Sequence, residues 1–290
     1  MKRNFLLDLT LLIGLNLLVK PFYILVIEAG VQNAVGPEAY GSYFALINFS
    51  FILNIFLDFG ITNWNTRRIA TEPENALHGL GTLMRLRIWL ALIFFIVSLS
   101  TGLMLGYDGE MMYGLILLSV NQCLASFVLF LRSWLNGLHL FRADSLVSIL
   151  DRFILILIVG GLLLMHKSEF RITWFIWAQT AAYALTALTA AVFIFKKGSL
   201  RSGHHTGYRE ILGQSLPFAI LIFISAIAYR VDSVMIERMH SSGAREAGIY
   251  AMGFRFFEAF NMIAYLFAVI LLPTYARLIS QKESVQPILT

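Results

Sequence analysis

Four charged residues interrupt the apolar stretch Ser225–Pro273, namely Arg230, Asp232, Arg255 and Glu258. A charge inside a membrane span costs from about 2.5 kcal/mol upwards, so such residues usually face a protein interior or a water-filled cavity. Cationic side chains in such a cavity meet anionic ligands, and acidic ones pair with cations or relay protons. The stretch therefore predicts a functional cavity.

Lys20 lies near the middle of the first apolar segment, too deep for its ammonium group to reach water easily. The functional interpretation is a cavity cation that meets an anionic substrate, because ionisable residues at this depth are usually functional. The alternative is a structural ion pair, with Asp58 or Glu258, that fixes helix packing. The candidate substrate-binding residues are Lys20, Arg255 and Arg230.

Arg230 and Asp232 are two positions apart, so they point to opposite sides of one helix. One of them is expected to face the cavity while the other pairs with a neighbouring segment. Alternatively, Arg230 extends to the outer membrane interface, since it lies near that end of its segment.

Arg255, Glu258 and Asn261 recur at every third position and form a polar stripe on one helix face. A stripe of this kind is expected of a helix that lines water. An Arg255–Glu258 pair within the helix would neutralise itself, and both interpretations hold together if that pair tunes the charge of the cavity.

The remaining candidates are supporting polar residues, for some of which ion coupling is an alternative. Asp58 lies near the cytoplasmic end of its segment, ahead of Arg67 and Arg68, and is interpreted as a structural pair or a helix-end residue. Glu28, at the outer end of the first segment, is interpreted as interfacial. The supporting set comprises Asp232, Glu258, Asn261, Asp58 and Glu28.

The composition requires that most of this chain be buried in lipid or protein. Of its 290 residues 58% are hydrophobic and only 13% charged, with a mean hydropathy of +0.75. Soluble domains have roughly 25% charged residues. The apolar runs are continuous and about 20 residues long, which predicts membrane helices rather than a barrel. The expected fold class is an all-α polytopic membrane protein.

About eight segments reach the length that a bilayer requires. Pro21 interrupts the first and Pro217 the seventh. The expected spans are Leu6–Glu28, Tyr40–Ile61, Leu83–Leu105, Met111–Leu131, Leu146–Met165, Trp174–Phe195, Ile211–Met235 and Gly248–Leu272.

The distribution of Lys and Arg predicts a cytoplasmic N-terminus, because cytoplasmic loops are enriched in both. The opposite side then holds only Lys167, Arg171, Arg238 and Arg245. The cytoplasmic set is Lys2, Arg3, Arg67, Arg68, Arg85, Arg87, Arg132, Arg142, Arg152, Lys196, Lys197, Arg201, Arg209, Arg277 and Lys282. The same bias explains the net charge of +5. No basic patch with interleaved aromatics lies outside the membrane, so a nucleic-acid partner is excluded.

The polar stretch Lys196–Tyr208 predicts a linker between two lobes. Residues 1–195 would form a first lobe of six transmembrane helices, residues 196–209 a cytoplasmic linker and residues 210–290 the start of a second, truncated lobe.

The turns into the second and eighth segments form a weak internal repeat. When Gly41 is aligned with Gly248, Tyr43 falls on Tyr250. Many transporters consist of repeats that hold the substrate site between them.

No motif for catalysis is present: the chain has no nucleophile motif, no P-loop and no paired metal-ligand spacing. We expect no enzyme, no cofactor and no metal site. His204-His205 is interpreted as part of a solvated linker and the lone Cys123 as a packing residue. An alternative from another class is a membrane glycosyltransferase or polysaccharide polymerase. Such an enzyme would need acidic catalytic residues on an outward loop, and Asp108 and Glu110 are the only acidic residues between the third and fourth segments.

Several short motifs resemble one family of membrane transporters. Val35–Tyr43 (VGPEAYGSY), Leu57–Ile61 (LDFGI) and Arg67-Arg68 are similar to the start of bacterial polysaccharide flippases of the O-antigen type. Asp232–Ile236 (DSVMI), Ala247–Tyr250 (AGIY) and Leu272-Pro273 are similar to the start of their second lobe. These flippases share a superfamily with multidrug and toxin extrusion transporters and the lipid II flippase.

The resemblance implies two helical lobes around a central cavity with alternating access. It implies transport of an undecaprenyl-diphosphate-linked oligosaccharide across the bacterial inner membrane for surface polysaccharide synthesis. Lys20 and Arg255 stand where the family places cavity cations, and arginine can bind a diphosphate bidentately. Membrane lipids and other polysaccharide-assembly membrane proteins are further expected partners.

Family members usually have twelve to fourteen helices, so the resemblance also implies that this chain is a fragment. The residues Gln281–Thr290 resemble the start of another span. The nearest alternative function is a drug or cation antiporter of the same superfamily, although Lys20 and Arg255 oppose binding of cationic drugs.

Overall fold

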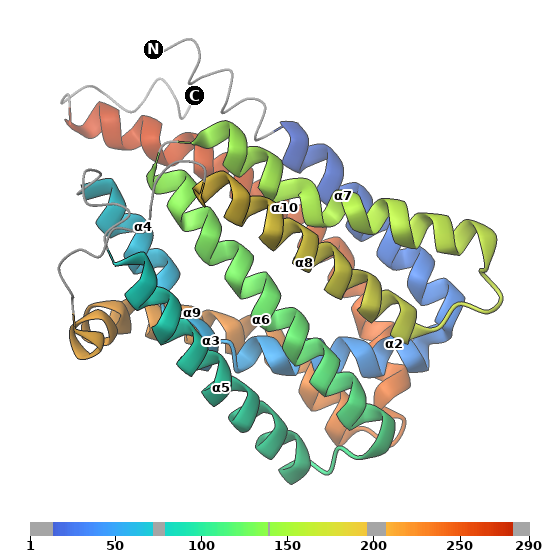
Figure 1. Cartoon of the computed structure of the whole chain (residues 1–290). Coiled ribbons are helices and arrows are strands. Elements are labelled where there is room, and N and C mark those ends of the chain that lie inside the picture. Colours follow the sequence, from blue (N-terminus) through green and yellow to red (C-terminus); the bar gives the residue numbers. More distant parts are fainter. Residues whose placement is uncertain (1–13, 72–78, 139, 196–206, 281–290) are drawn as a thin grey trace.

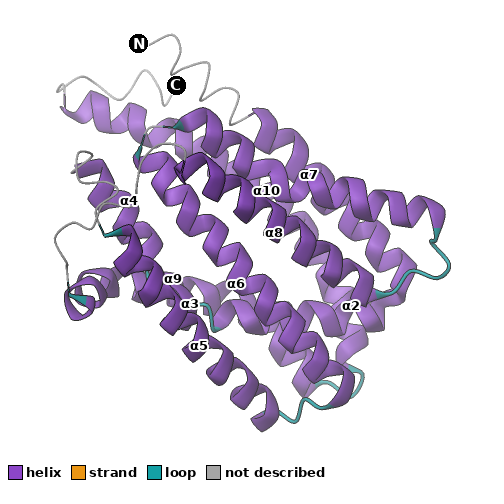
Figure 2. Ribbon diagram, viewed as in Figure 1, coloured by secondary structure: helices purple, strands orange, loops and turns teal. Residues whose placement is uncertain are grey.

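The computed structural model describes residues 14–71, 79–138, 140–195 and 207–280. These residues form helices joined by short connections, with no strand among them (Figure 2). The all-α prediction is confirmed. The elements are η1 (Tyr23–Glu28), α2 (Ala29–Ile52), α3 (Ile55–Asp58), α4 (Ile61–Thr71), α5 (Leu80–Met104), α6 (Gly109–Gly137), α7 (Phe141–Met165), α8 (Ile172–Phe195), α9 (Tyr208–Met239) and α10 (Gly243–Ser280).

Six helical stretches of the described chain are long and apolar enough to cross a membrane. They are Gly14–Ile52, Leu80–Met104, Gly109–Leu135, Arg142–Met165, Ile172–Ile194 and Tyr208–Met239. Two differences separate these six stretches from the eight predicted spans. The 39-residue stretch Gly14–Ile52 holds the described part of the first predicted span and most of the second, and α10, which corresponds to the eighth, is not among the six.

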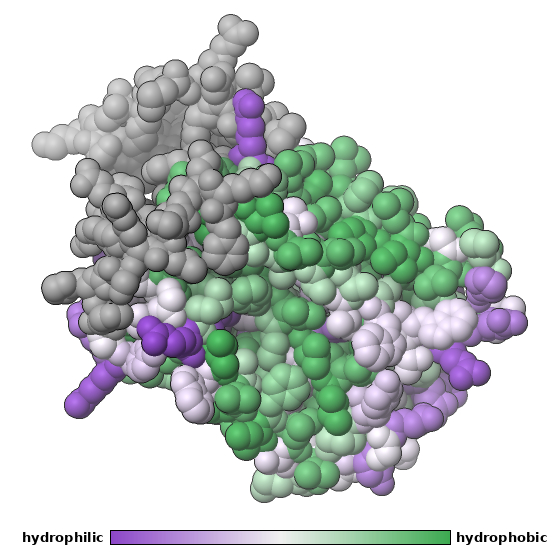
Figure 3. Space-filling model, in the orientation of Figure 1, coloured by the Kyte–Doolittle hydropathy of each residue, from purple (hydrophilic) through white to green (hydrophobic). Residues whose placement is uncertain are grey.

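Apolar side chains cover the outside of the helix bundle. Leu18, Ile96, Leu164 and Leu221 are each between 65% and 89% exposed. On the face in Figure 3, hydrophobic residues occupy the middle and hydrophilic residues gather towards opposite ends. A surface of this kind matches a bilayer, where apolar side chains meet lipid tails and polar groups lie near the headgroups. The chain is a multi-pass membrane protein.

The first helical stretch departs from regular α-helix at two places. A single π-helical segment, η1, begins two residues after Pro21, whose missing N–H group disturbs the α-helical ladder. A sharper break follows at Gly36, where φ is +82° and ψ is 166°, a conformation that favours glycine. Pro37 restarts the helix, and Figure 1 shows the chain reversing direction between the blue and the paler blue helices.

The prediction of one continuous span over Tyr40–Ile61 is wrong, because the helix ends at Ile52. The short α3 follows, and then Phe59 and Gly60 adopt positive φ angles of 48° and 72°. A Cβ atom on Gly60 would lie 2.7 Å from the Ser215 carbonyl oxygen of α9. The left-handed turn therefore permits a close approach between α3 and α9 that a larger residue would prevent.

The two copies of the predicted repeat cross each other in the fold. A Cβ atom on Gly41 would lie 1.7 Å from the Ala244 carbonyl oxygen, and one on Gly248 would lie 1.9 Å from the Pro37 carbonyl oxygen. These contacts are equivalent, because Pro37 and Ala244 each precede the aligned glycine by four residues. Helices α2 and α10 therefore pack backbone against backbone, related by a local pseudo-symmetry.

Helix α9 contacts the preceding helices near both of its ends. Near its start, the Trp64 indole N–H donates to Gln214 Oε1 at 2.9 Å. Near its end, Arg238 donates to the Leu105 carbonyl oxygen at 2.7 Å, and the Tyr107 hydroxyl donates to Glu237 at 3.2 Å. Helix α9 begins at Tyr208, two residues before the expected start of the second lobe at residue 210. Residues 196–206 of the expected linker and the stretch 281–290 lie outside the described residues.

Candidate functional site

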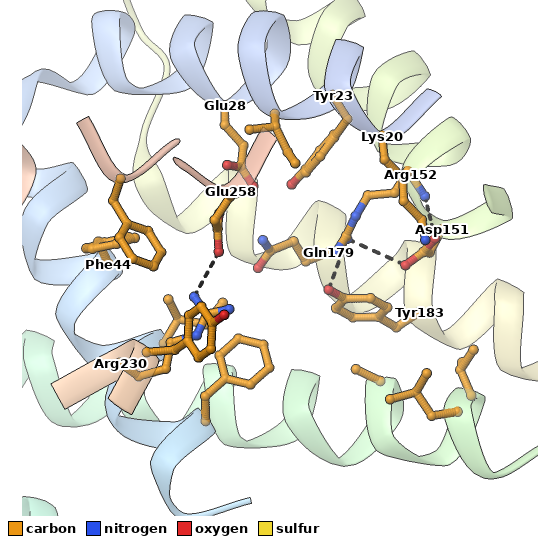
Figure 4. Close-up of a pocket in the computed structure, with 18 of the residues that line it drawn as sticks. Lys20, Tyr23, Glu28, Phe44, Asp151, Arg152, Gln179, Tyr183, Arg230 and Glu258 are labelled. Atoms are coloured by element: carbon orange, nitrogen blue, oxygen red, sulfur yellow. Dashed lines mark hydrogen bonds and ion pairs between the residues drawn. The ribbon is translucent and has the colours of Figure 1, made fainter. Parts of the chain in front are cut away.

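A cavity of about 540 Å³ lies between the first helical stretch, α2, α6, α7 and α8 on one side and α9 and α10 on the other. Its volume falls within the roughly 300–1,000 Å³ of typical small-molecule sites. The lining is mixed, with charged, amide and hydroxyl groups set among aromatic rings (Figure 4). It is formed by Lys20, Tyr23, Ile24, Glu28, Tyr40, Tyr43, Phe44, Ile47, Phe51, Ala125, Val128, Leu129, Arg132, Val147, Ser148, Asp151, Arg152, Gln179, Tyr183, Tyr229, Arg230, Phe254, Phe257, Glu258 and Asn261.

One end of the cavity is basic. Arg152 of α7 donates to the Tyr183 hydroxyl at 3.2 Å and lies 3.5 Å from the Asp151 carboxylate. Its guanidinium group also lies 4.8 Å from the centre of the Tyr23 ring. Lys20 lines the same end, and no carboxylate of the described residues lies within ion-pair distance of its ammonium group. The structural pairs of Lys20 with Asp58 or Glu258 are therefore not formed here.

Arg132 is a further cation of the lining, but it is held in a bidentate ion pair. Its Nε and Nη2 atoms donate to the two carboxylate oxygens of Asp144 at 2.7 and 3.1 Å. Bidentate pairs of this kind fix the guanidinium plane and satisfy much of its charge. Arg132 therefore acts on the cavity mainly through its positive charge, because two of its donor groups are already bound to Asp144.

The other end of the cavity brings together Arg230 of α9 and Glu258 of α10. Arg230 Nη1 donates to Glu258 Oε1 at 3.0 Å and to Asn48 Oδ1 at 2.9 Å. The same guanidinium group lies 4.8 Å from the ring centre of Phe51 and 5.7 Å from that of Phe254. Arg230 therefore faces the cavity rather than the membrane interface, and Glu258 pairs with it rather than with Arg255.

Glu28 lies beside Glu258 at this second end (Figure 4), and Asn261 is a further lining residue. The sequence interpretation placed Glu28 at the outer interface, but the helix continues past it to the break at Gly36. The wider turn of the π-helix between Lys20 and Glu28 lets both residues face one cavity, since each π-helical residue advances by less than an α-helical one.

Arg255 is not part of the lining. It is buried, donates to Gln32 Oε1 and lies 5.4 Å from the centre of the Tyr40 ring. Gln32 in turn donates to the Gly248 carbonyl oxygen at 2.7 Å. Arg255 therefore belongs to the contact between α2 and α10. Of the polar stripe predicted on α10, only Glu258 and Asn261 line the cavity.

Two of the supporting candidates lie away from the cavity. Asp232 is exposed, does not line the cavity, and accepts a hydrogen bond from the Tyr250 hydroxyl at 3.2 Å. Asp58 is buried in an ion pair with Arg87 at 2.6 Å. Its partner is thus Arg87 of α5, not Arg67 or Arg68, which follow it in the sequence.

Sequence reasoning missed Arg152 and Arg132 as site residues. Both were assigned to the cytoplasmic ends of spans, because each lies close to a predicted boundary. The structure begins α7 at Phe141, so that Arg152 lies three helical turns inside the helix. The adjacent pair Asp151-Arg152 within an apolar run was the signal that could have revealed it.

The arrangement is suited to binding a ligand with charged and polar groups. The basic end offers an ammonium group and a guanidinium group to an anion, and the second end offers carboxylates and amides as hydrogen-bond partners. Within the described part of the chain, no group of three or more His, Cys, Asp or Glu residues could hold a metal ion.

The described helices thus enclose a charged cavity within a multi-pass helical protein. The family model for polysaccharide biosynthesis proteins matches residues 8–279, so the chain belongs to that family. Two of the solved structures that share its fold are described as transporters of the MOP superfamily.

Three solved structures share this fold. An inward-facing multidrug resistance transporter of the superfamily is 18% identical, with a TM-score of 0.59, over 81% of this chain and 57% of its own. A transporter from Pyrococcus furiosus Vc1, described as having a binding pocket of reverse polarity, is 18% identical, with a TM-score of 0.54, over 80% of this chain and 54% of its own. A multidrug and toxin extrusion transporter in a bent conformation is also 18% identical, with a TM-score of 0.50, over 91% of this chain and 68% of its own.

The chain thus spans little more than half the length of the first two structures. A comparison with curated proteins gave no match.

Proposed function

We propose that this chain acts as a flippase for an undecaprenyl-diphosphate-linked oligosaccharide, which it moves across the bacterial inner membrane for surface polysaccharide synthesis. The N-terminus lies in the cytoplasm in this proposal. A first lobe, residues 1–195, and a second lobe that begins at residue 210 alternate in access around the cavity, joined by the linker 196–209. The lipid tail stays in the bilayer while the headgroup crosses.

The observation that carries the proposal is the basic end of the cavity. Of the four cations in the lining, Arg132 and Arg230 are held in close ion pairs. Lys20 has no ion pair with a described residue, and Arg152 has only a 3.5 Å contact with Asp151. A diphosphate carries two negative charges, and an ammonium group beside a guanidinium group offers it charge-assisted hydrogen bonds.

The proposal assigns different roles to the original candidates. Lys20 and Arg152 bind the diphosphate directly, and Arg230 contributes to the other end of the headgroup site. Arg255 acts indirectly, because its contacts with Gln32 and Tyr40 support the crossing of α2 and α10.

The family description supports a polysaccharide-related substrate, and the charge of the lining supports an anionic one. The lining holds Lys20, Arg132, Arg152 and Arg230 against Glu28, Asp151 and Glu258. Lys20 and Arg152, the two cations without a close ion pair, oppose the binding of cationic drugs at their end of the cavity, because like charges in a low-dielectric cavity repel.

Export of surface polysaccharide in a strain lacking its own flippase tests the proposal. The chain as it is made in the cell should restore export, and Lys20→Ala or Arg152→Ala should each lower it by about tenfold or more, as expected for a lost charge-assisted hydrogen bond. Arg171→Ala is the matched control, because Arg171 is exposed in the connection before α8. Normal export by both cavity variants, at wild-type membrane levels, would show that the diphosphate is bound elsewhere.

A further inference from the structure

The charges of the cavity lining are separated along its length. Lys20, Arg152 and Asp151 lie towards one side of Figure 4, and Glu28, Glu258 and Arg230 towards the other. Lys20 and Glu28 are eight residues apart on one helical stretch, which would span about 12 Å as an α-helix and spans less here because Tyr23–Glu28 is π-helical. The basic end carries a net positive charge and the other end a net negative one.

Glu28 faces the Tyr23 hydroxyl but has no cation within ion-pair distance in the described part of the chain. No cation of the described residues forms an ion pair with it within 4.0 Å, and the neighbouring Glu258 carboxylate repels it electrostatically. Arg152 and Arg255 attract it only from beyond ion-pair distance. A carboxylate accepts hydrogen bonds and donates none, so a ligand here must supply hydroxyl or ammonium groups.

Tyr23 adds a second unsatisfied group. Its side chain is only 1% exposed, and its hydroxyl has no hydrogen-bond partner among the described residues, although it interacts electrostatically with Glu28. In Figure 4 the ring points into the cavity between the two ends. Buried hydroxyl groups are normally hydrogen-bonded, so a bound ligand is expected to complete this one.

Aromatic rings form the wall beside the acidic end. The ring centres of Phe44 and Phe254 are 5.8 Å apart, those of Phe254 and Phe257 are 5.5 Å apart, and Tyr229 lies 6.0 Å from Phe257. The C–H face of a sugar ring packs well on such a surface, while its hydroxyl groups point to polar neighbours. Aromatic walls with a few convergent polar groups are typical of small-molecule sites.

We propose that the acidic end of the cavity is a sugar subsite for neutral or ammonium-bearing sugars, and that Glu28 excludes sugars that carry a carboxylate. The inference rests on the proposed flippase function, because the diphosphate at Lys20 and Arg152 places the first sugar near Glu28. Tyr23 and Glu28 supply the polar contacts, and the Phe44–Phe254 wall supports the ring.

Binding to the full chain in proteoliposomes tests this specificity. The probes are three polyprenyl diphosphates whose first sugar is a neutral hexose, a hexosamine with a free ammonium group or a hexuronic acid. The wild-type protein should bind the hexuronic acid probe about tenfold or more weakly than the neutral one, because two carboxylates would face each other. Glu28→Gln should reduce this difference below about threefold, since the charge is lost and the shape is kept.

Asp232→Asn is the matched control, because Asp232 is an exposed carboxylate of α9 that does not line the cavity. It should leave the ratio unchanged, and undecorated polyprenyl diphosphate should bind all three proteins equally. Equal binding of all sugars by the wild-type protein would overturn the subsite and leave the flippase proposal intact. Unchanged discrimination in Glu28→Gln would remove Glu28 from its role, and failure to bind any diphosphate would overturn both proposals.

Discussion

At the scale of single residues, Arg87 connects α5 to three other helices through one guanidinium group. It forms an ion pair with Asp58 of α3 at 2.6 Å, and donates to the Thr62 hydroxyl of α4 and to the Ser126 carbonyl oxygen of α6, each at 3.0 Å. Asp58 also accepts hydrogen bonds from Thr62. The left-handed turn after Asp58 is thus anchored by a buried charge pair.

Replacing Arg87 by glutamine should destabilise the protein strongly. The change leaves the Asp58 carboxylate buried without a cation, which typically costs about 3–5 kcal/mol. The midpoint of thermal unfolding in detergent should therefore fall, and Asp58→Asn in the same protein should recover part of the loss. Arg85→Gln is the control, because Arg85 is exposed on the same helix. Similar midpoints for the two arginine variants would contradict this role of Arg87.

At the scale of elements, the crossing of α2 and α10 sets the geometry of the cavity. Tyr43 and Phe44 follow Gly41 on one helix, and Phe254 follows Gly248 on the other. The backbones approach so closely at the two glycines that these aromatic side chains meet a turn or two further along, where Phe44 packs against Phe254. Contact between the backbones thus decides which side chains reach the cavity.

Alanine at Gly41 or at Gly248 should disrupt this crossing. The added Cβ atom would lie 1.7 or 1.9 Å from a carbonyl oxygen of the facing helix, so the backbones must separate. The cost should reach or exceed the roughly 1–3 kcal/mol of overpacked cores, because backbone cannot rotate away as a side chain can.

The yield of monodisperse protein in size-exclusion chromatography measures the effect of these alanines. Gly253→Ala on α10 is the control, since a Cβ atom there would meet nothing within 4 Å. A wild-type yield for Gly41→Ala would mean that the helices tolerate a wider crossing.

At the scale of the whole molecule, a polar cluster joins the connection between α5 and α6 to the end of α9. The Tyr107 hydroxyl donates to Glu237, and the Arg238 guanidinium group lies 3.9 Å from the centre of the Tyr107 ring. Tyr107 is only 1% exposed. The cluster holds the end of α9, which belongs to the proposed second lobe, against the α5–α6 connection of the first, so its opening would accompany any rocking of the lobes.

The stability that Tyr107 contributes should depend on pH only in the alkaline range. Burial, reinforced by the Glu237 carboxylate and opposed by Arg238, raises the pKa of Tyr107 from 10.0 to about 12. Because the pKa is higher in the folded state, this contribution is complete below pH 10 and is lost as the pH rises from about 10 to about 12.

Thermal unfolding of the wild-type protein and of Tyr107→Phe between pH 8 and about 12 checks this expectation. The unfolding midpoint of the wild-type protein should fall more steeply above pH 10 than that of Tyr107→Phe. Tyr113→Phe is the control, because Tyr113 is 48% exposed. Parallel pH profiles for the wild-type protein and Tyr107→Phe would contradict the assignment.

The class of the molecule and most of its helices follow from the amino-acid sequence alone. A segment of about 20 apolar residues must satisfy its own backbone hydrogen bonds in lipid, and this requirement is local to each segment. The third to eighth predicted segments accordingly match α5 to α10. The prediction of a continuous second span is wrong because the turn at Phe59 and Gly60 depends on Arg87 and on the approach of α9, and neither of these is close in the sequence.

Only the tertiary structure decided which charges share the cavity. Arg230 reaches Glu258 across 28 positions, Arg87 reaches Asp58 across 29 and Arg255 reaches Gln32 across 223. The spacing of polar residues fixes the face of a helix on which each one lies, but not the neighbour that this face meets. That neighbour depends on how the helices rotate and cross, which the glycine contacts of α2 and α10 set. For this reason Arg152 lines the cavity and Arg255 does not.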